Sequence, residues 1–329
     1  MKKWIKRLLL LTILAALLGA GGLAWYADQP LRIQPLPKAV NVTPGMNLKS
    51  LSAMLEREGV VGNAQVFWLL GRVLDRGSRL KVGVYTLDKP LTPLGLYDTF
   101  EHGEITQAIV QFIEGWNWRE VRAALAAQPL LNKDSAEMSD AELLQAIGAV
   151  ENHPEGLLFP DTYFYAPHSS DLDVLRRAYR LQHDKLLAAW ETRAPGLPYR
   201  NPYEALIMAS IVEKETGAAS ERPMIAGVFI NRLRLGMRLQ TDPTVIYGLG
   251  ERFDGNLRKA DLQSDTPYNT YIRVGLPPTP IAMPSEAAIQ AALNPAKTNA
   301  LYFVARGNGR HVFSSTLEAH NRAVNRYQK

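Results

Sequence analysis

The sequence predicts an α+β protein in three parts: an N-terminal membrane-spanning helix, a small α+β unit and a larger mixed α+β domain. Residues 8–26 form an uncharged apolar run, which predicts the first part. Residues 39–104 and 105–329 both mix alternating strand patterns with amphipathic helical patterns. With 329 residues, 47% hydrophobic and 21% charged, the chain is typical of a globular protein with one large core or two smaller ones.

The apolar run LLLLTILAALLGAGGLAWY, residues 8–26, is the first predicted element. It is about as long as a helix that crosses a bilayer core of roughly 30 Å. Trp25 and Tyr26 close the run, as aromatic residues at a membrane interface do. The alternative is a cleaved signal peptide, with Gly22 and Ala24 as the small residues before the cut. The spanning length of the run favours an uncleaved anchor.

The net charge of +5 is concentrated before this run. Lys2, Lys3, Lys6 and Arg7 carry four of these charges, which leaves +1 for the rest of the chain. A basic tail at residues 1–7 predicts a cytoplasmic N-terminus and an exported remainder. No nucleic-acid partner is expected, because that would need a basic face on the folded domain. The chain has no cysteine, which excludes disulfides, thiolate metal sites and a lipid-modified cysteine.

Residues 27–38 contain three prolines and no helical period, so they predict an extended linker. The unit that follows is expected to consist of a strand at 39–44, helices at 48–60 and 63–77, a strand at 81–87 and a short helix at 91–104. This order and the motif VTPGMNLKSLSAML resemble carbohydrate-binding modules of the LysM type. The alternative is a small α+β packing domain that binds no glycan.

The larger domain, residues 105–329, is expected to begin with a strand. Its next elements are a helix from about Trp118, helical spacing within 133–150, an aromatic and proline-rich loop at 151–167 and a long helix at 171–192. An apolar helix that ends in ASIVEKETG follows, then a helix that ends at Gly236. A loop with five prolines occupies residues 264–285.

Glu213 and Glu215 end the apolar helix and are the candidate catalytic residues. At 100° per residue, Glu215 shares a stripe with Met208 and Ile211, whereas Glu213 points toward other faces. Burial against a partly closed cleft would raise the pKa of Glu215, and a protonated carboxyl group can act as a general acid. The alternative is that both are solvated charges at a helix end, although carboxylates there face the negative end of the helix dipole.

Polar and aromatic residues after this helix are candidates for sugar binding, because sugar rings need flat apolar faces and fixed hydrogen bonds. The candidate substrate-binding residues are Gln240, Thr241, Asp242, Tyr247, Tyr268, Asn269, Thr270 and Tyr271. Asp242 is either a second carboxylate for Glu215 or a turn residue before Pro243.

Other chemistries lack a sequence pattern. The chain contains no HExxH, no histidine pair at ligand spacing, no GxSxG and no phosphate-binding glycine loop. The scattered histidines, interpreted as surface or capping residues, are His102, His153, His168, His183, His311 and His320. No metal or cofactor is therefore expected.

Several long motifs resemble the YceG-like endolytic murein transglycosylases. They are EGLLFPDTYFY, ASIVEKETG, INRLRLGMRLQTDPTVIYGLG and YNTYIRVGLPPTPIAMP, in this order along the chain. The resemblance extends over nearly the whole chain and implies a single-pass inner-membrane enzyme with a periplasmic catalytic domain. The catalytic glutamate of that family matches Glu215, and Glu213 is the secondary candidate.

The resemblance also implies a reaction. Such an enzyme cleaves the β-1,4 bond between N-acetylmuramic acid and N-acetylglucosamine within glycan strands and leaves 1,6-anhydro ends, without metal or cofactor. Its partners would be peptidoglycan strands and the synthases whose nascent strands it terminates. Two alternatives stay open: a muramidase that hydrolyses the same bond, and a non-catalytic scaffold that binds peptidoglycan.

Overall fold

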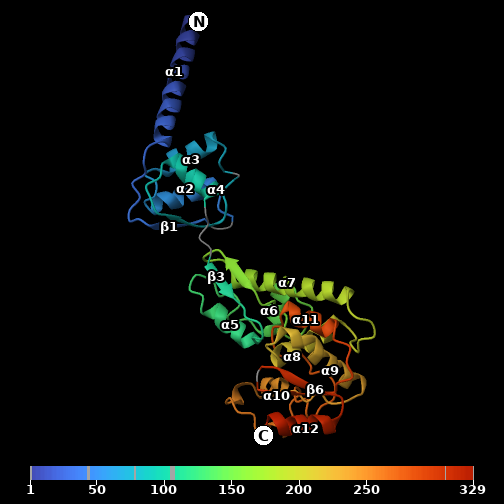
Figure 1. The fold of residues 1–329 in the computed structure, drawn as a ribbon. Helices are drawn as coiled ribbons and strands as arrows, with labels where there is room; N and C mark the ends of the chain where they lie inside the picture. Colours follow the sequence, from blue (N-terminus) through green and yellow to red (C-terminus); the bar gives the residue numbers. More distant parts are fainter. Residues whose placement is uncertain (1, 43–44, 78, 104–107, 308, 329) are drawn as a thin grey trace. The chain divides into compact units, whose positions relative to one another are not determined.

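The computed structural model describes residues 2–42, 45–77, 79–103, 108–307 and 309–328. The chain forms two compact units. The smaller is Met1–Ala108 with Phe164–His168, and the larger is Ile109–Tyr163 with Ser169–Lys329 (Figure 1). Each unit mixes helices with two-stranded sheets, so the predicted mixed α+β class is confirmed.

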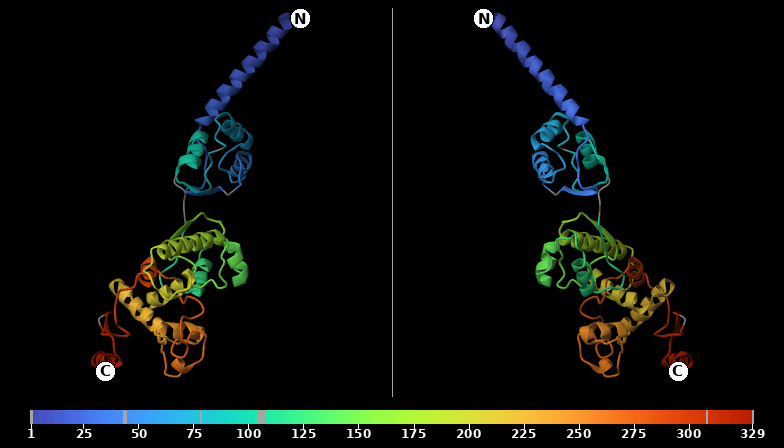
Figure 2. Two further views of the ribbon diagram at one scale, coloured as in Figure 1. Left: turned by 90° about the vertical axis from the view of Figure 1, so that its right-hand side faces the viewer. Right: turned by 90° about the vertical axis from the view of Figure 1, so that its left-hand side faces the viewer.

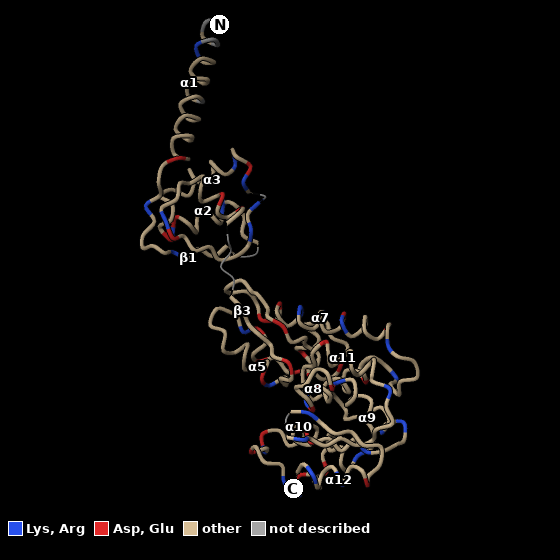
Figure 3. The backbone as a smooth tube through the Cα atoms, in the orientation of Figure 1, with Lys and Arg blue, Asp and Glu red and all other residues tan. Residues whose placement is uncertain are grey.

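The apolar N-terminal run is helical, as predicted, and belongs to α1 (Lys2–Ala27). Its segment Arg7–Ala27 has 21 residues, and the apolar 18-residue window in it has a mean hydropathy of 2.2 and no residue buried inside the protein. This helix is long and apolar enough to cross a membrane. Figure 3 shows no charged position along the helix beyond its N-terminal end. Arg7 is exposed, whereas the side chains of Lys2, Lys3 and Lys6 lie outside the described residues.

The segment expected to be an extended linker, residues 27–38, is not a free connection. Its backbone is irregular up to β1, but Ala27, Leu31 and Ile33 are buried in the core of the smaller unit. The backbone N–H of Leu31 donates to the carbonyl of Leu91 over 2.8 Å. Prolines exclude a helix here, but an extended chain still turns alternate side chains to one side. Leu31 and Ile33 are two positions apart, so their side chains point to the same side and pack into the core of the smaller unit.

The smaller unit contains the strands and helices predicted for it. They are β1 (Lys38–Val42), α2 (Leu48–Arg57), α3 (Ala64–Val73), β2 (Gly83–Leu87) and α4 (Pro93–His102). β1 and β2 are antiparallel, with Val40 opposite Tyr85. Asn47, Asn63 and Thr92 cap the three helices with their side chains, which explains where each helix begins. Thr43, Pro44 and Glu104, part of the predicted elements, lie outside the described residues.

An aromatic pair organises the core of this unit. The rings of Phe67 on α3 and Tyr97 on α4 stack with centroids 4.3 Å apart. The Tyr97 hydroxyl donates to the carbonyl of Phe67 over 2.7 Å, so the buried phenol is satisfied. Gly71 makes room for this hydroxyl, because a Cβ at that position would collide with it.

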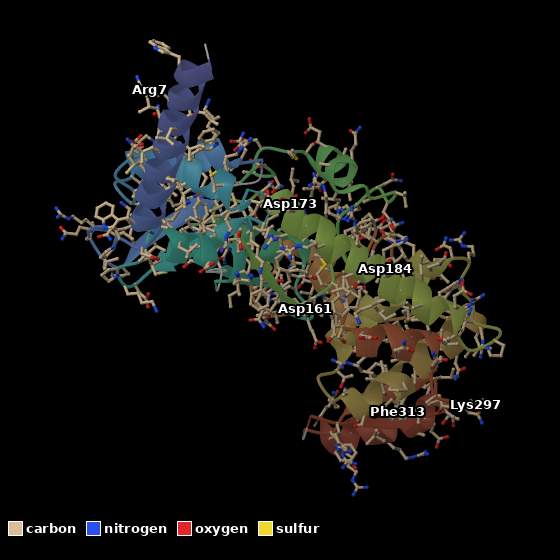
Figure 4. The ribbon with its side chains drawn as sticks, turned by 90° about the horizontal axis from the view of Figure 1, so that it is seen from above. Arg7, Asp161, Asp173, Asp184, Lys297 and Phe313 are labelled. Atoms are coloured by element: carbon tan, nitrogen blue, oxygen red, sulfur yellow. The ribbon has the colours of Figure 1, made fainter. Side chains whose placement is uncertain are left out.

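The larger unit is mainly helical. The elements up to the candidate site are β3 (Ala108–Gln111), α5 (Trp118–Ala126), α6 (Asp140–Ile147), β4 (Thr162–Tyr165), α7 (Asp171–Glu191), α8 (Pro202–Glu215), α9 (Arg222–Arg234) and α10 (Asp242–Leu249). Of these residues, Ala108 in β3 and Phe164 and Tyr165 in β4 count with the smaller unit. Asp173 and Asp184, labelled in Figure 4, lie along α7. The predicted helical stretch 133–150 forms a helix only at α6, and Thr106 and Gln107 of the predicted strand lie outside the described residues.

Helix α8 is the centre of this unit. Residues 205–212 are buried on every side, and the helix packs against α7, α9, α10 and α11 (Glu286–Leu293). A helix that is apolar all round is a core helix and not an amphipathic one. The stripe expected for Met208 and Ile211 therefore does not separate Glu215 from Glu213. Only the environment at the end of the helix can do so.

A hairpin and a helix follow the loop at 264–285. They are β5 (Tyr302–Ala305), β6 (His311–Ser314) and α12 (Leu317–Tyr327). β5 and β6 are antiparallel, with Phe303 opposite Phe313. Figure 2 shows the hairpin and α12 in red and the α10 region in orange at the same end of the unit. Both contribute to the cavity described next.

Candidate active site

Glu215, the last residue of α8, lines a cavity of about 530 Å³ within the larger unit. The walls come from six places: the end of α8, α9, the start of α10, the loop around Tyr271, the β5–β6 hairpin and α12. Residues far apart in the sequence therefore meet at one carboxyl group. The polar residues that share the cavity with it are Arg232, Gln240, Asp242, Tyr271, Tyr302, His311, His320, Asn321 and Gln328.

The environment of Glu215 favours its protonated form. The pKa of the Glu215 carboxyl is raised from 4.5 to about 7, mainly by burial and in smaller part by the nearby charge of Asp242. A hydrogen bond from Thr241 and the charges of His311 and Arg232 act in the opposite direction. The side chain is half-buried and still reaches the cavity. Glu215 can thus hold a proton near neutral pH and present it to a ligand.

A network of three threonines holds Thr241 against Glu215. The Thr241 hydroxyl donates to Oε1 of Glu215. The Thr244 hydroxyl donates to the carbonyl of Thr241 over 2.8 Å, so in its 2.9 Å contact with Thr270 it accepts. Thr270 in turn accepts the Thr241 N–H over 3.1 Å. Because Oε1 receives this hydrogen bond, the carboxyl proton belongs on Oε2.

The turn before α10 fixes two further predicted residues. Gln240 has a φ of 52°, in the left-handed region that costs a residue with a side chain roughly 1–3 kcal/mol. Its N–H donates to the carbonyl of Thr270 over 3.1 Å, which holds this conformation. Asp242 begins α10, and its Oδ1 accepts the Tyr271 hydroxyl at 2.5 Å. Gln240, Asp242 and Tyr271 reach the cavity, as expected of residues that bind a ligand.

The buried residues among the predicted set act indirectly. Thr241, Asn269 and Thr270 are at most 2% exposed. The Asn269 amide donates to the carbonyl of Ser264 over 2.7 Å, and its oxygen accepts the Tyr271 N–H. Asn269 and Thr270 are not among the residues that line the cavity, and their contact with substrate stays a prediction. Both polar groups are used to hold the loop that carries Tyr271.

Arg232, His311 and His320 complete the cavity and were not among the predicted site residues. Arg232 is buried and donates to the carbonyls of Leu239 and Leu301, each over 2.6 Å. Burial lowers its pKa, and Arg232 is the one lysine or arginine among the described residues that line the cavity. These two bonds connect the segment before Gln240 with the start of the hairpin.

His311 is fixed by Glu221. The ring Nδ1 of His311 lies 2.9 Å from Oε2 of Glu221, and the backbone N–H of His311 donates to the same carboxylate. Burial opposes ionisation of Glu221, but the hydrogen bonds from His311 and its charge outweigh burial, so the pKa of Glu221 is lowered. The expected role of His311 as a surface or capping residue is therefore wrong, because it lines the cavity.

Glu213 has a different environment from Glu215. Its side chain is 6% exposed and forms an ion pair with Arg222 at 2.9 Å. Its second oxygen accepts the N–H of Ser285 over 2.9 Å and the hydroxyl of the same residue. Ser285 is the N-cap of α11. Glu213 thus connects α8, α9 and α11, and both of its oxygens are occupied.

Tyr247 and Tyr268 line a second cavity of about 920 Å³, together with Trp118, Glu155 and Lys214. Their rings meet edge to face, with centroids 4.8 Å apart. The Tyr247 hydroxyl donates to Glu155 over 2.9 Å, and the backbone N–H of Trp118 donates to both oxygens of the Glu155 carboxyl group. Burial raises the pKa of Glu155 to about 7. The two cavities are lined by residues that are adjacent in the sequence. Glu215 and Asp242 line the first cavity, and Lys214 and Pro243 line the second.

A cluster of possible metal ligands lies elsewhere. Among the described residues, Asp98, Glu101 and His102 on α4 have atoms close enough to share an ion. The guanidinium of Arg76 lies 3.1 Å from Asp98 and 2.6 Å from Glu101, and so supplies the positive charge there. This group belongs to the smaller unit and takes no part in the cavity around Glu215.

The fold and the site together define a mixed α+β protein with a membrane-length apolar helix and a cavity built around a proton-holding carboxyl group. The sequence model of the YceG-like family matches residues 40–326. The chain belongs to the YceG-like family.

Curated relatives cover most of the chain. The endolytic murein transglycosylase of Bacillus subtilis (strain 168) is 31% identical over an alignment of 305 residues, and the match covers 88% of this chain and 84% of that protein. The endolytic murein transglycosylase of Streptococcus pneumoniae (serotype 2, strain D39) is 29% identical over 354 residues. That match covers 95% of this chain, and this chain spans 63% of the pneumococcal protein.

A crystal structure of a YceG-like protein from Listeria monocytogenes has a similar fold. It superposes with a TM-score of 0.54 and is 31% identical. The superposition covers 87% of this chain and 98% of that one.

Proposed function

We propose that this chain is an endolytic lytic transglycosylase of peptidoglycan with Glu215 as its single catalytic acid and base. The observation that carries the proposal is a carboxyl group with a pKa of about 7 at the wall of a 530 Å³ cavity. The relatives named endolytic murein transglycosylases support the substrate class. Glu213 is not proposed for this role, because Arg222 and Ser285 occupy its two oxygens.

In the first step, Oε2 of Glu215 protonates the oxygen of the β-1,4 bond between N-acetylmuramic acid and N-acetylglucosamine. The bond from C1 of the muramic ring to this oxygen breaks as the proton arrives. Positive charge then develops at C1 and the ring oxygen. The carboxylate formed on Glu215 lies beside this charge, and the hydrogen bond from Thr241 stabilises it.

In the second step, the same carboxylate takes the proton from the C6 hydroxyl of the muramic ring. The C6 oxygen then bonds to C1 and closes a 1,6-anhydro ring. The proton lost in the first step is recovered, and no water is consumed. One group with a pKa near the working pH suits both steps, because it must give and take a proton in turn.

Other parts of the cavity are proposed to orient the sugar. Gln240, Asp242 and Tyr271 offer an amide, a carboxylate and a phenol within reach of a ligand in the cavity. Tyr247 and Tyr268 in the second cavity offer aromatic faces for a sugar unit farther along the strand. A strand that continues on both sides of the cleaved bond is what an endolytic enzyme must hold.

The location follows from the same proposal. Helix α1 would anchor the chain in the inner membrane, with residues 1–7 in the cytoplasm and residues 105–329 as the periplasmic catalytic domain. Residues 39–104 are proposed to be a LysM-like glycan-binding part. The strand, helix, helix, strand order supports this, as does a cavity of about 540 Å³ lined by Asn47 and Trp68. Cleavage beside peptidoglycan synthases would terminate nascent strands.

Purified full-length protein in detergent, incubated with uncrosslinked glycan strands, tests the activity. Shortened strands with 1,6-anhydromuramic ends are expected. Shortened strands with reducing ends would favour the muramidase alternative. Binding to sacculi without any shortening would favour the non-catalytic scaffold.

A further inference from the structure

The last turn of α1 is part of the folded smaller unit. Leu23 and Tyr26 pack against the core cluster of that unit, and Ala27 is buried in it. The helix contacts both α3 and α4. The anchor and the unit therefore join without a spacer.

The length of α1 places this junction at the edge of the bilayer. The 21 residues Arg7–Ala27 extend about 31 Å at 1.5 Å per residue. The hydrocarbon core of a bilayer is about 30 Å thick, so a helix that starts at Arg7 leaves it near Ala27. The surface of the unit around the end of α1 must then lie at the lipid headgroups.

Helix α3, which contacts α1, carries apolar residues on its outer side. Phe67 and Leu70 face the core, and the opposite side carries Leu69 and Val73, which are 47% and 65% exposed. Leu74, at the C-cap, is also exposed. Figures 1 and 2 show α3 on the side of the unit from which α1 leaves.

Basic residues lie among and after these exposed apolar residues in the sequence. The stretch after Leu70 carries Arg72, Arg76, Arg79 and Lys81 against a single acid, Asp75. Arg76 is committed to Asp98 and Glu101, but Arg72 and Arg79 are exposed. Exposed leucine and valine beside arginine are typical of a helix that lies in a membrane interface, where anionic headgroups attract the cations.

We infer that the outer side of α3, with Leu69, Arg72 and Val73, lies on the surface of the bilayer that α1 crosses, together with the exposed Arg79 beyond the helix end. The occupant of this surface is the phospholipid headgroup layer. The inference rests on the proposed membrane span of α1 and is independent of the proposed chemistry at Glu215. It makes the smaller unit a rigid base on the membrane instead of a module on a flexible tether.

The absence of native cysteine allows a direct test with single spin labels. Full-length protein with Leu69→Cys or Val73→Cys is labelled with a nitroxide and placed in nanodiscs of phosphatidylcholine and phosphatidylglycerol. Arg57→Cys, at the exposed end of α2, is the matched control in the same unit. Leu17→Cys reports whether α1 spans the bilayer.

The expected result is a several-fold lower collision rate with a water-soluble nickel relaxer at 69 and 73 than at 57. Collisions with oxygen should be highest at 17. Equal nickel collision rates at 57, 69 and 73, with 17 inside lipid, would overturn the docking and leave the anchor in place. A label at 17 in water would overturn the span and the docking together. Protection of 69 and 73 by glycan strands in detergent but not by nanodiscs would also overturn the proposal. Glycan cleavage is measured on each variant and is expected to be unchanged.

Discussion

Thr241 donates a hydrogen bond from its hydroxyl to Oε1 of Glu215, while Thr270 and Thr244 hold its backbone N–H and carbonyl. This contact joins the end of α8 to the turn before α10. It orients the carboxyl group and stabilises its charged form. The proton of the acid is thereby assigned to the oxygen that has no such donor.

Removal of this hydroxyl should change both rate and pH dependence. Thr241→Val is expected to lower kcat roughly ten- to a hundredfold, because the carboxyl group is no longer oriented. The pKa of Glu215 should rise, since Thr241 lowers it in the wild type. Activity that needs the protonated acid should then persist to higher pH.

Thr241→Ser is the matched control, because it keeps the hydroxyl. It should restore most of the rate and the original pH profile. A pH profile of kcat/KM that is the same in Thr241→Val and wild type would show that Thr241 does not act on the carboxyl group.

The raised pKa of Glu215 also predicts a change in stability with pH. Between pH 4.5 and about 7 the folded chain keeps a proton that the unfolded chain has lost. The free energy of unfolding should therefore fall as pH rises through this window, by at most about 3 kcal/mol from this group.

Glu215→Gln should remove that part of the fall, and the part due to Glu155 should stay. Urea unfolding of wild type and variant at about pH 5 and about pH 8 measures the difference. Identical pH dependence in both would contradict the buried environment of Glu215.

Glu213 is expected to affect stability more than chemistry. Glu213→Gln leaves the buried Arg222 without its ion-pair partner and should destabilise the larger unit by about 3 kcal/mol. Cleavage per folded molecule should stay well above that of Glu215→Gln. Thermal unfolding together with initial rates below the transition separates the two effects. A fully stable but inactive variant would transfer the catalytic role to Glu213.

The second cavity is expected to affect binding of long strands. Tyr268→Ala removes one face of the aromatic pair and should raise KM for long glycan strands several-fold, with little change in kcat. A glycan too short to reach this cavity serves as the control substrate, and its KM should not change. Equal effects on both substrates would mean that the ring supports the fold and does not contact sugar.

Much of the fold could be predicted because local signals mark it. Asn47, Asn63 and Thr92 cap helices where polar residues precede apolar periodicity, and the short strands alternate. The buried irregular segment at 27–38 could not be predicted in this way. Prolines indicate a break in helix, but they carry no information on whether Leu31 and Ile33 find a core.

The site could be predicted only in part, because some of its residues come from elements that are distant in the sequence. Gln240, Asp242 and Tyr271 stand near Glu215 because short segments of polar and aromatic residues surround the cavity. Arg232 and His311 reach it from α9 and β6, and no spacing in the sequence relates these residues to Glu215. The helical stripe did not separate the two glutamates, since α8 is buried on all sides. The partners of each carboxyl group separate them instead.

Product analysis by mass spectrometry tests the central claim most directly. Wild-type protein and Glu215→Gln are each incubated with uncrosslinked glycan strands, and the new ends are identified. Wild type is expected to produce 1,6-anhydromuramic ends, lighter by one water than hydrolysed ends, and the folded variant to produce none. Reducing ends from the wild type, or undiminished anhydro ends from the variant, would contradict the account.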